Sequence, residues 1–224
     1  MTHFLVFGHR GSPRRFPENS IESFEETLRV GADGFETDLR LLADGQSILF
    51  HDDELGDQAI ETLTAPECHE RGVRVARLAE LASFAGRCTM ILEVKRGGWD
   101  AQLLSEVGSW PGVVIASFDH TLIRSLAERK AGCELGVTIF GALVAAGEYV
   151  GSVGASWCFP SFRHVTRPAV ELLHQRSVRV IPWTPNRESE WETLRAIGCD
   201  GIITDDPEGA VRWRERTGGQ ALNR

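Results

Sequence analysis

The stretch GFETDLRLLADGQSILFHDD, residues 34–53, decides how this chain folds. Residues 34–38 form a short strand candidate, and two short extended pieces then flank Asp44–Gly45, a dipeptide that favours a tight hairpin turn. The stretch therefore predicts one buried strand that leads directly into a β-hairpin. Such a hairpin interrupts an otherwise regular repeat of strands and helices.

That repeat runs along the rest of the chain. The predicted strands are 4–8, 34–38, 89–95, 113–118, 134–139, 155–160, 179–184 and 201–204, and the predicted helices are 20–30, 77–85, 101–109, 120–130, 141–150, 167–175, 188–196 and 207–216. Asn19 and Ser23 are each followed by a glutamate three residues later, which predicts caps for the first helix. Eight strand–helix repeats predict an α/β fold, a (β/α)8 TIM barrel with a small β-hairpin inserted after strand 2. An open doubly wound sheet is the alternative.

Composition limits the class of protein. The 224 residues carry a formal net charge of −8, with 42% hydrophobic and 25% charged residues. We expect one globular domain over residues 1–217, followed by a flexible tail over 218–224. The acidic balance argues against nucleic-acid binding, which needs a basic face. No apolar run approaches the ~20 residues that span a bilayer, so we expect no stable membrane insertion.

The cysteines bear on the compartment. There are five, an odd number, and they are widely spaced without a CxxC pair. We expect reduced thiols and, since no basic-then-apolar leader precedes the first strand, a cytoplasmic location. Neither GxGxxG nor GxxxxGK[ST] occurs, so nucleotide binding lacks its usual signal. The oligomeric state is left open.

Polar side chains gather where the predicted strands end, which is where a barrel of parallel strands carries its chemistry. His9 and Arg10 end the first strand, and His51 ends the return strand of the hairpin. Glu93 and Lys95 end the third barrel strand. We therefore expect these side chains to meet at one mouth.

Acidic residues on two strands suggest a cation site. Glu36 and Asp38 are two residues apart, so they point to the same side of their strand. Phe35 and Leu39 have the opposite parity and are expected to pack against helices, which turns the acids inward. With Glu93 nearby, the carboxylates would repel one another unless a cation lay between them. Oxygen donors favour a hard divalent cation, Mg²⁺ or Ca²⁺, and no His/Cys set has zinc spacing.

The remaining polar residues at the mouth suit a phosphate. His9 and His51 come from different strands and can divide the work of general acid and general base. Arg10 offers a bidentate fork and Lys95 a point charge. A divalent cation, two cationic side chains and two histidines together predict a pocket that cleaves phosphodiesters.

Simpler interpretations stay open for several of these residues. Glu93 and Lys95 can form a structural ion pair. Asp205–Asp206 precedes Pro207, which predicts the N-cap of the last helix. Trp183, at the end of the seventh strand, can be ordinary barrel packing.

Short blocks of sequence carry a further indication. They are HRG at 9–11, PENS at 17–20, SF at 23–24, GADGFETDL at 31–39, DG at 44–45, HD at 51–52, LEVK at 92–95, SF at 117–118, PWTPN at 182–186 and GCDGIITDDP at 198–207. In order and spacing, the chain resembles the glycerophosphodiester phosphodiesterase family. The resemblance extends from residue 8 to about residue 207 and is highly specific as a combination.

The resemblance implies a (β/α)8 barrel and hydrolysis of glycerophosphodiesters to sn-glycerol 3-phosphate and an alcohol such as choline or ethanolamine. It implies roles for nine residues: His9 and His51 as the acid–base pair, Arg10 and Lys95 at the phosphate, Glu18 close to the site, Trp183 on the alcohol side, and Glu36, Asp38 and Glu93 around a divalent cation.

The chain also departs from the family pattern. The short run containing Arg-Thr that usually follows HD is missing, and the segment between HD and LEVK is short, which leaves little room for an inserted subdomain. Pro185 stands where the family usually has a small apolar residue. Two alternatives therefore remain: a lysophospholipid-directed phosphodiesterase, for which Phe16, Trp99, Trp157, Phe159 and Phe162 are candidate apolar contacts, and a non-catalytic barrel that binds phosphodiesters.

Overall fold

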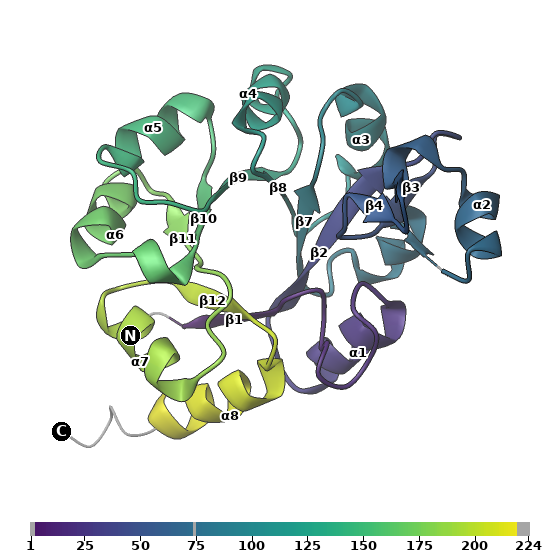
Figure 1. Cartoon of the computed structure of the whole chain (residues 1–224). Helices are drawn as coiled ribbons and strands as arrows, with labels where there is room; N and C mark the ends of the chain where they lie inside the picture. Colours follow the sequence, from purple (N-terminus) through teal and green to yellow (C-terminus); the bar gives the residue numbers. More distant parts are fainter. Residues whose placement is uncertain (1–2, 74, 219–224) are drawn as a thin grey trace.

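The predicted barrel is confirmed by the computed structural model, which describes residues 3–73 and 75–218. Parallel strands form a ring with helices outside it (Figure 1). The barrel strands are β1 (Leu5–Gly8), β2 (Gly34–Leu41), β7 (Thr89–Val94), β8 (Val113–Ser117), β9 (Glu134–Ile139), β10 (Trp157–Pro160), β11 (Arg179–Val180) and β12 (Gly201–Thr204). They lie in the order β11-β10-β9-β8-β7-β2-β1-β12. A hydrogen bond of 2.9 Å from Ile203 N to Pro182 O joins the two ends of this order.

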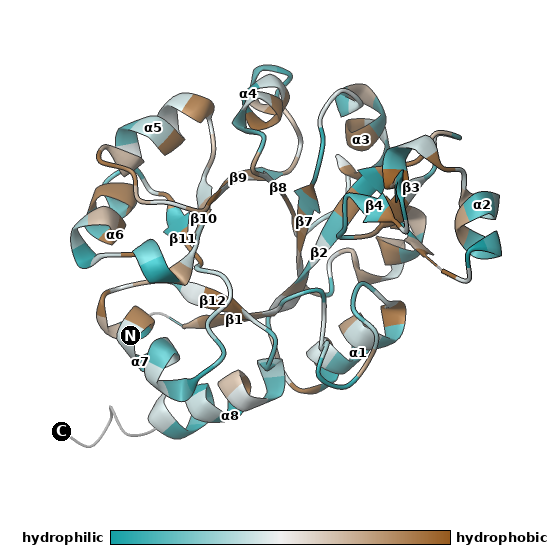
Figure 2. Cartoon of the chain, in the orientation of Figure 1, coloured by the Kyte–Doolittle hydropathy of each residue, from teal (hydrophilic) through white to brown (hydrophobic). Residues whose placement is uncertain are grey.

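Helical segments cover the outside of the ring. They are α1 (Ile21–Arg29), η2 (Leu78–Phe84), α3 (Asp100–Val107), α4 (His120–Glu128), α5 (Ala146–Val153), α6 (Arg167–His174), α7 (Glu188–Ala196) and α8 (Pro207–Gly218). The segment predicted at 77–85 is a 3₁₀ helix, and the one predicted at 141–150 begins later, at Ala146. Figure 2 shows apolar residues on the strands and on the inward faces of helices such as α3 and α4.

The hairpin predicted after β2 is also confirmed. Strand β3 (Ser47–Leu49) pairs antiparallel with the far end of β2, and Gly45 in the turn has a φ of +81°, which glycine adopts without strain. Beyond it lies a small lobe made of β4 (Glu54–Leu55), β5 (Gln58–Ala59), η1 (Ile60–Thr62), α2 (Ala65–Glu70) and β6 (Ala76–Arg77). Its apolar centre consists of Leu42, Ile48, Ile60, Leu63 and Cys68. The short segment thus holds a compact lobe, although little room was expected.

Two apolar cores lie on either side of the strands. The larger one fills the space between strands and helices, where Phe35 stacks on Phe24 of α1 as its parity predicts. The smaller one closes the barrel interior and consists of Phe7, Ile91, Val114, Ala116, Trp157, Phe159, Ile181 and Ile203. Gly136 makes room for it, because a Cβ there would lie 2.4 Å from Cε2 of Phe159. The polar strand ends therefore stand above an apolar floor.

The first helix begins differently from the prediction. Its N-cap is Ser20, whose side chain accepts a hydrogen bond from Ser23 N. Asn19 does not cap the helix, because its amide is bonded to Thr37 and Asp38 on β2. The two predicted caps are therefore wrong, and Asn19 belongs to the barrel mouth.

Three further expectations concern the whole chain. No helix within residues 3–73 and 75–218 is long and apolar enough to cross a membrane. All five cysteines are free thiols, as expected. The predicted tail starts at Gly218, the last residue of α8, and residues 219–224 lie outside the described residues.

Candidate active site

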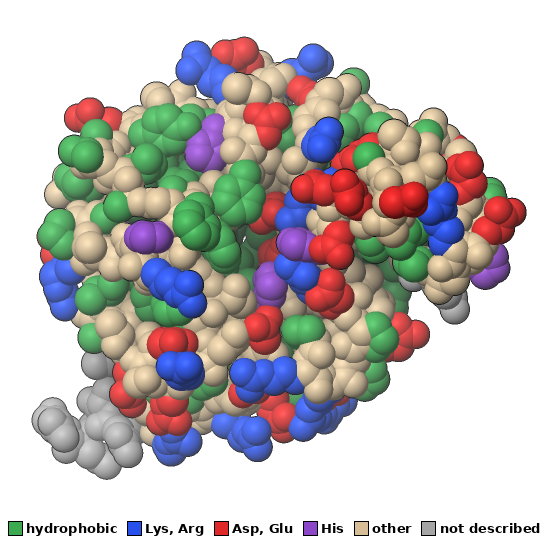
Figure 3. Space-filling model, viewed as in Figure 1, with side chains coloured by type: hydrophobic (Ala, Val, Ile, Leu, Met, Phe, Trp, Pro, Cys, Tyr) green, Lys and Arg blue, Asp and Glu red, His purple; other side chains and the backbone are tan. Residues whose placement is uncertain are grey.

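The carboxyl ends of the barrel strands surround a cavity of about 80 Å³. Its lining contains eight of the nine predicted site residues, all but Glu18, and consists of His9, Arg10, Glu36, Asp38, His51, Ile91, Glu93, Lys95, Ala116, Phe118, Thr138, Phe159, Trp183 and Ile203. Figure 3 shows histidine, acidic and basic side chains gathered on one side of this mouth and hydrophobic side chains on the other.

Three buried carboxylates lie on two neighbouring strands. Asp38 on β2 is the register partner of Glu93 on β7, and Glu36 lies two residues before Asp38. Burial and the nearby charge of Asp38 raise the pKa of Glu36 to about 8. Burial also acts to raise the pKa of Asp38, but the charges of Lys95 and Arg10 outweigh it and hold this pKa below its usual range. Near neutral pH, Glu36 therefore mostly keeps its proton, whereas Asp38 is ionised.

Lys95 and Arg10 are the cations that face these acids. Lys95 Nζ lies 2.6 Å from Asp38 Oδ1 and also contacts Glu93, so the ion pair considered for Glu93 and Lys95 is present. Arg10 Nε lies 3.2 Å from Asp38 Oδ2, and the Arg10 backbone N–H donates to Glu36 Oε2 at 3.0 Å. The two cationic side chains thus hold Asp38 and Glu93, and the Arg10 backbone holds Glu36.

Glu18 lies at the rim, outside the cavity. Arg10 Nη1 donates to both of its carboxylate oxygens at 3.0 Å. Glu18 and His51 also line a neighbouring groove of about 530 Å³ that runs beside β3 and β6. The role of Glu18 visible here is to hold the Arg10 guanidinium.

Each of the two histidines is held by an aspartate. His9 Nδ1 lies 2.7 Å from Asp205 Oδ1, and His51 Nδ1 lies 2.8 Å from Asp52 Oδ1. Burial acts to lower the pKa of His9, but the bond to Asp205 and the charge of Glu36 outweigh it and raise this pKa above 6.5. In both rings Nδ1 is engaged, so Nε2 is the nitrogen left to exchange a proton at the mouth.

Asp205 was interpreted from the sequence as part of a helix cap, and that interpretation is wrong for this residue. Asp206 alone supplies the cap bond, from Gly209 N at 2.9 Å. Asp205 instead holds His9, and its carboxylate accepts one hydrogen bond from Asn186 Nδ2 at 2.6 Å. The sequence signal for this role was the position of Asp205 just after the last strand.

Asn19 is a second residue that sequence reasoning missed. Its Nδ2 donates to Asp38 Oδ2 at 2.9 Å, and its Oδ1 accepts from the Thr37 hydroxyl at 2.7 Å. The backbone of Asn19 has a φ of +54°, a conformation that asparagine tolerates better than most residues. The same asparagine therefore shapes the turn and orients a carboxylate.

Aromatic rings border the other side of the mouth. Trp183 donates from Nε1 to Phe159 O at 2.9 Å, and its ring lies 5.8 Å from Phe118 and 6.2 Å from Phe140 between ring centroids. Phe118 and Phe140 are 49% and 66% exposed. Buried Thr138 also lines the cavity, and its hydroxyl has no hydrogen-bond partner among the described residues.

Most of the aromatic residues named from the sequence as candidate apolar contacts lie away from the mouth. Trp99, Trp157 and Phe159 are buried in the cores. Phe16 is exposed, but neither it nor half-buried Phe162 lines the cavity. Of the five candidate apolar contacts, Phe159 alone lines the cavity, and the other four do not.

The carboxylates have the donor chemistry of a hard-cation site, but they are arranged around Lys95. Within residues 3–73 and 75–218, no three His, Cys, Asp or Glu side chains form a ready-made metal site. Burial, together with the charges of Asp38 and Glu93, raises the pKa of Glu36, so a negative charge on Glu36 is not fully compensated by the cations nearby. A divalent cation would supply that compensation, since its preferred ligands are carboxylate oxygens.

Comparison with known proteins decides the family. The sequence pattern described as "Glycerophosphoryl diester phosphodiesterase family" matches residues 9–61 and 89–209, well over half of the chain. The chain belongs to this family. The family predicted from the sequence blocks, and the phosphodiesterase class that it carries, are thereby confirmed. The two matched segments leave out most of the lobe, residues 62–88.

Individual relatives agree with this membership. The chain is 27% identical over 240 residues to a glycerophosphodiester phosphodiesterase from Caldanaerobacter subterraneus, covering 96% of this chain and 99% of that protein. Its fold is similar to that of an Oleispira antarctica phosphodiesterase solved in complex with the product sn-glycerol-3-phosphate, with a TM-score of 0.83, 21% identity, and coverage of 94% and 96%. A Thermotoga maritima glycerophosphodiester phosphodiesterase gives a TM-score of 0.77 at 23% identity, with coverage of 95% and 99%.

Proposed function

We propose that this chain hydrolyses glycerophosphodiesters to sn-glycerol 3-phosphate and an alcohol, with a divalent cation and two histidines. The observation that carries the proposal is the pairing of His9 and His51, each held at Nδ1 by an aspartate, across one small cavity from buried carboxylates and cations. Family membership supports the reaction class. The cation and the two histidine roles are the parts that the experiments must establish.

Charge balance supports the cation. Glu36, Asp38 and Glu93 can contribute three negative charges, and Arg10 and Lys95 contribute two positive ones. A phosphodiester adds a further negative charge, so a bound Mg²⁺ or Ca²⁺ would bring the sum to neutral. The three carboxylates would hold the cation, which when bound stabilises negative charge on the phosphate oxygens. Lys95 and Arg10 would then turn their donors to the phosphate.

The histidines would move the protons. The raised pKa of His9 favours its protonated form, which suits a donor to the leaving alkoxide. His51 would take the proton from the nucleophile, either a water or a hydroxyl of the substrate glycerol. Asp205 and Asp52 would keep each Nε2 directed at the reacting atoms. Glu18 would keep Arg10 extended toward the phosphate.

The decisive experiment measures release of glycerol 3-phosphate from glycerophosphocholine and glycerophosphoethanolamine, with Mg²⁺, with Ca²⁺ and with chelator. We expect release with a divalent cation and none in chelator. Full activity in chelator would contradict the cation site. Binding of the substrates without turnover would support the non-catalytic alternative.

A second candidate substrate class has one observation in its favour. The exposed ring of Phe118 lines the cavity that holds the phosphate site, and the exposed ring of Phe140 lies 6.2 Å from that of Trp183 in the same lining. A lysophospholipid would place its phosphodiester in the cavity and its acyl chain on this rim. Release of choline from lysophosphatidylcholine, with none from glycerophosphocholine, would favour this class.

Two broader predictions accompany the proposal. We propose that residues 1–217 fold as a single domain, which limited proteolysis would show as one resistant fragment cut near residue 218. We also keep the predicted cytoplasmic location as a proposal. Fractionation of the source cells, with an antibody against the chain, would test it directly.

A further inference from the structure

Arg40 is a buried cation to which the catalytic scheme gives no role. It lies on β2, two residues after Asp38, and its side chain is 2% exposed. It does not line the cavity. Its guanidinium reaches instead toward the segment that carries His51, at the junction between barrel and lobe.

The contacts of Arg40 converge on that segment. Nη2 donates to the backbone carbonyl of His51 at 2.7 Å, and Nε donates to the same carbonyl at 3.3 Å. Nη2 also lies 2.7 Å from Asp53 Oδ1, and Nη1 pairs with Glu61 in the lobe. One side chain thus ties β2 to His51, to the residue two positions later and to η1.

Little else fixes the backbone of His51. Strand β3 ends at Leu49, and the last backbone bond before His51 runs from Phe50 N to Asp38 O at 3.0 Å. Within the described chain, the two bonds from Arg40 are the hydrogen bonds made to the His51 carbonyl. The planar fork of arginine spreads its donors over three nitrogens in fixed directions, whereas all the donors of lysine lie on one nitrogen.

We infer that Arg40 is a positioning residue for His51, an inference that rests on the proposed function of that histidine. Asp38 and Arg40 both lie on β2, so this one strand positions the carboxylate site directly and His51 through Arg40. A shift of about 1 Å in a reacting group can lower the rate by about 10²-fold. Loss of the fork should therefore lower kcat and leave binding of substrate and cation largely intact.

The test uses Arg40→Lys, which keeps the charge and removes the fork, and Arg40→Met, which keeps only the stem. Arg87→Met is the matched control, because Arg87 makes two bonds to Glu25 on the exposed surface far from His51. We expect kcat to fall roughly 10- to 100-fold for Arg40→Lys, with KM changed less than about threefold. The control should stay at the wild-type rate. A kcat within twofold of wild type for Arg40→Lys would overturn the inference.

A double-mutant cycle separates positioning from general damage. If Arg40 acts through His51, Arg40→Lys should cost almost nothing further in a His51→Ala background. Equal losses in both backgrounds would mean that the substitution harms the whole site, and the inference would fall. Melting temperatures of all variants show which of them are folded, and Arg40→Lys carries the test if Arg40→Met unfolds.

A measurement without catalysis keeps this test distinct from the proposed function. The NMR signals of the His51 ring should shift or broaden in Arg40→Lys, while those of His9 stay unchanged. An unaltered His51 signal would contradict the inference whether or not the wild-type chain cleaves glycerophosphodiesters. Absence of wild-type activity, with the His51 signal altered, would contradict only the proposed function.

Discussion

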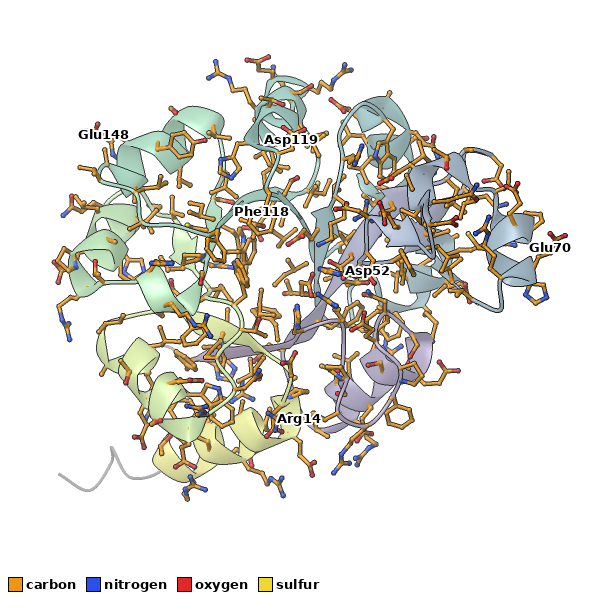
Figure 4. The ribbon with its side chains drawn as sticks, in the orientation of Figure 1. Arg14, Asp52, Glu70, Phe118, Asp119 and Glu148 are labelled. Atoms are coloured by element: carbon orange, nitrogen blue, oxygen red, sulfur yellow. The ribbon has the colours of Figure 1, made fainter. Side chains whose placement is uncertain are left out.

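On the β1, β2 and β7 side of the mouth, carboxylates, cations and histidines hold one another in place. On the β8, β9 and β11 side, aromatic rings stand at the rim. Figure 3 shows the charged and histidine side chains on one side and the hydrophobic ones on the other, and Figure 4 shows the same side chains as sticks. Figure 4 marks the two sides with Asp52, next to His51, and Phe118 at the end of β8. Asp38 alone contacts Arg10, Lys95 and Asn19. Phe118 and Phe140 contact mainly other rings.

This difference suggests that the polar side carries out the reaction and that the aromatic side binds the alcohol part of the substrate. The polar side is buried and cross-linked, as charge stabilisation requires, because donors that are already oriented need no rearrangement during the reaction. The aromatic side is exposed and offers only surface area and ring faces. We therefore expect substitutions on the polar side to change kcat and substitutions on the aromatic side to change KM and the choice of alcohol.

The largest effect is expected from the histidines. His9→Ala and His51→Ala should each lower kcat by about 10²-fold or more, because a general acid or base is lost. His174→Ala is the control, since His174 also bonds an aspartate, Asp200, but lies outside the mouth. Steady-state kinetics on glycerophosphocholine measure the change. Near wild-type turnover in either active-site variant would show that the polar side does not work through two histidines.

Glu36→Gln should change both cation binding and the pH dependence of stability. Burial and the charge of Asp38 raise the folded pKa of Glu36 to about 8, above its ordinary 4.5. Such a group stabilises the fold below its ordinary pKa, and this contribution is lost as pH rises through about 8. In chelator, the melting temperature of Glu36→Gln relative to wild type should therefore increase from pH 5 to pH 9.

Calorimetry of the same variant should show weaker binding of Mg²⁺ or Ca²⁺. Glu22→Gln, an exposed change on α1, serves as the control for both measurements. A melting-temperature difference that stays flat with pH would mean that Glu36 is ionised over the whole range and that its pKa is not raised.

Asp205→Asn should have an intermediate effect. The hydrogen bond that the Asp205 carboxylate accepts from His9 helps to raise the pKa of His9, so its loss should lower that pKa. The limb of the pH–rate profile that belongs to His9 should then move to lower pH, and kcat should fall by about 10-fold or more as the ring loses its orientation. A profile that stays at the wild-type position would show that Asp205 serves the fold rather than His9.

The smallest effect is expected on the aromatic side. Phe118→Ala should raise KM by about two- to tenfold for substrates whose alcohol contacts the ring, through lost apolar and cation–π contacts. Its kcat should stay close to wild type. Leu172→Ala removes another exposed apolar side chain away from the mouth and should change neither constant. A fall in kcat for Phe118→Ala would contradict the expectation that the aromatic side affects only substrate binding.

The sequence predicted the polar side far better than the aromatic side. Strand parity placed Glu36 and Asp38 inward, and the turn signal at Asp44–Gly45 placed the hairpin. Strand parity does not reveal a contact between residues that are far apart in the sequence. Asp205 was therefore interpreted as a helix cap, and Arg40 received no role. Rim aromatics such as Phe118 follow a strand end, where no periodicity applies. The helix α2 (Ala65–Glu70) is too short for its period to be recognised.

The bond between His9 and Asp205 also bears on how the chain becomes active. It joins residues 196 positions apart, and β1 and β12, which bring them together, are the first and last strands of the barrel. Contacts of such long range form late, since the chain must first close a very large loop. A polypeptide emerging from the ribosome would thus stay inactive until its last strand had docked. Turnover would then report barrel completion, and recovered activity should follow the slowest phase of refolding.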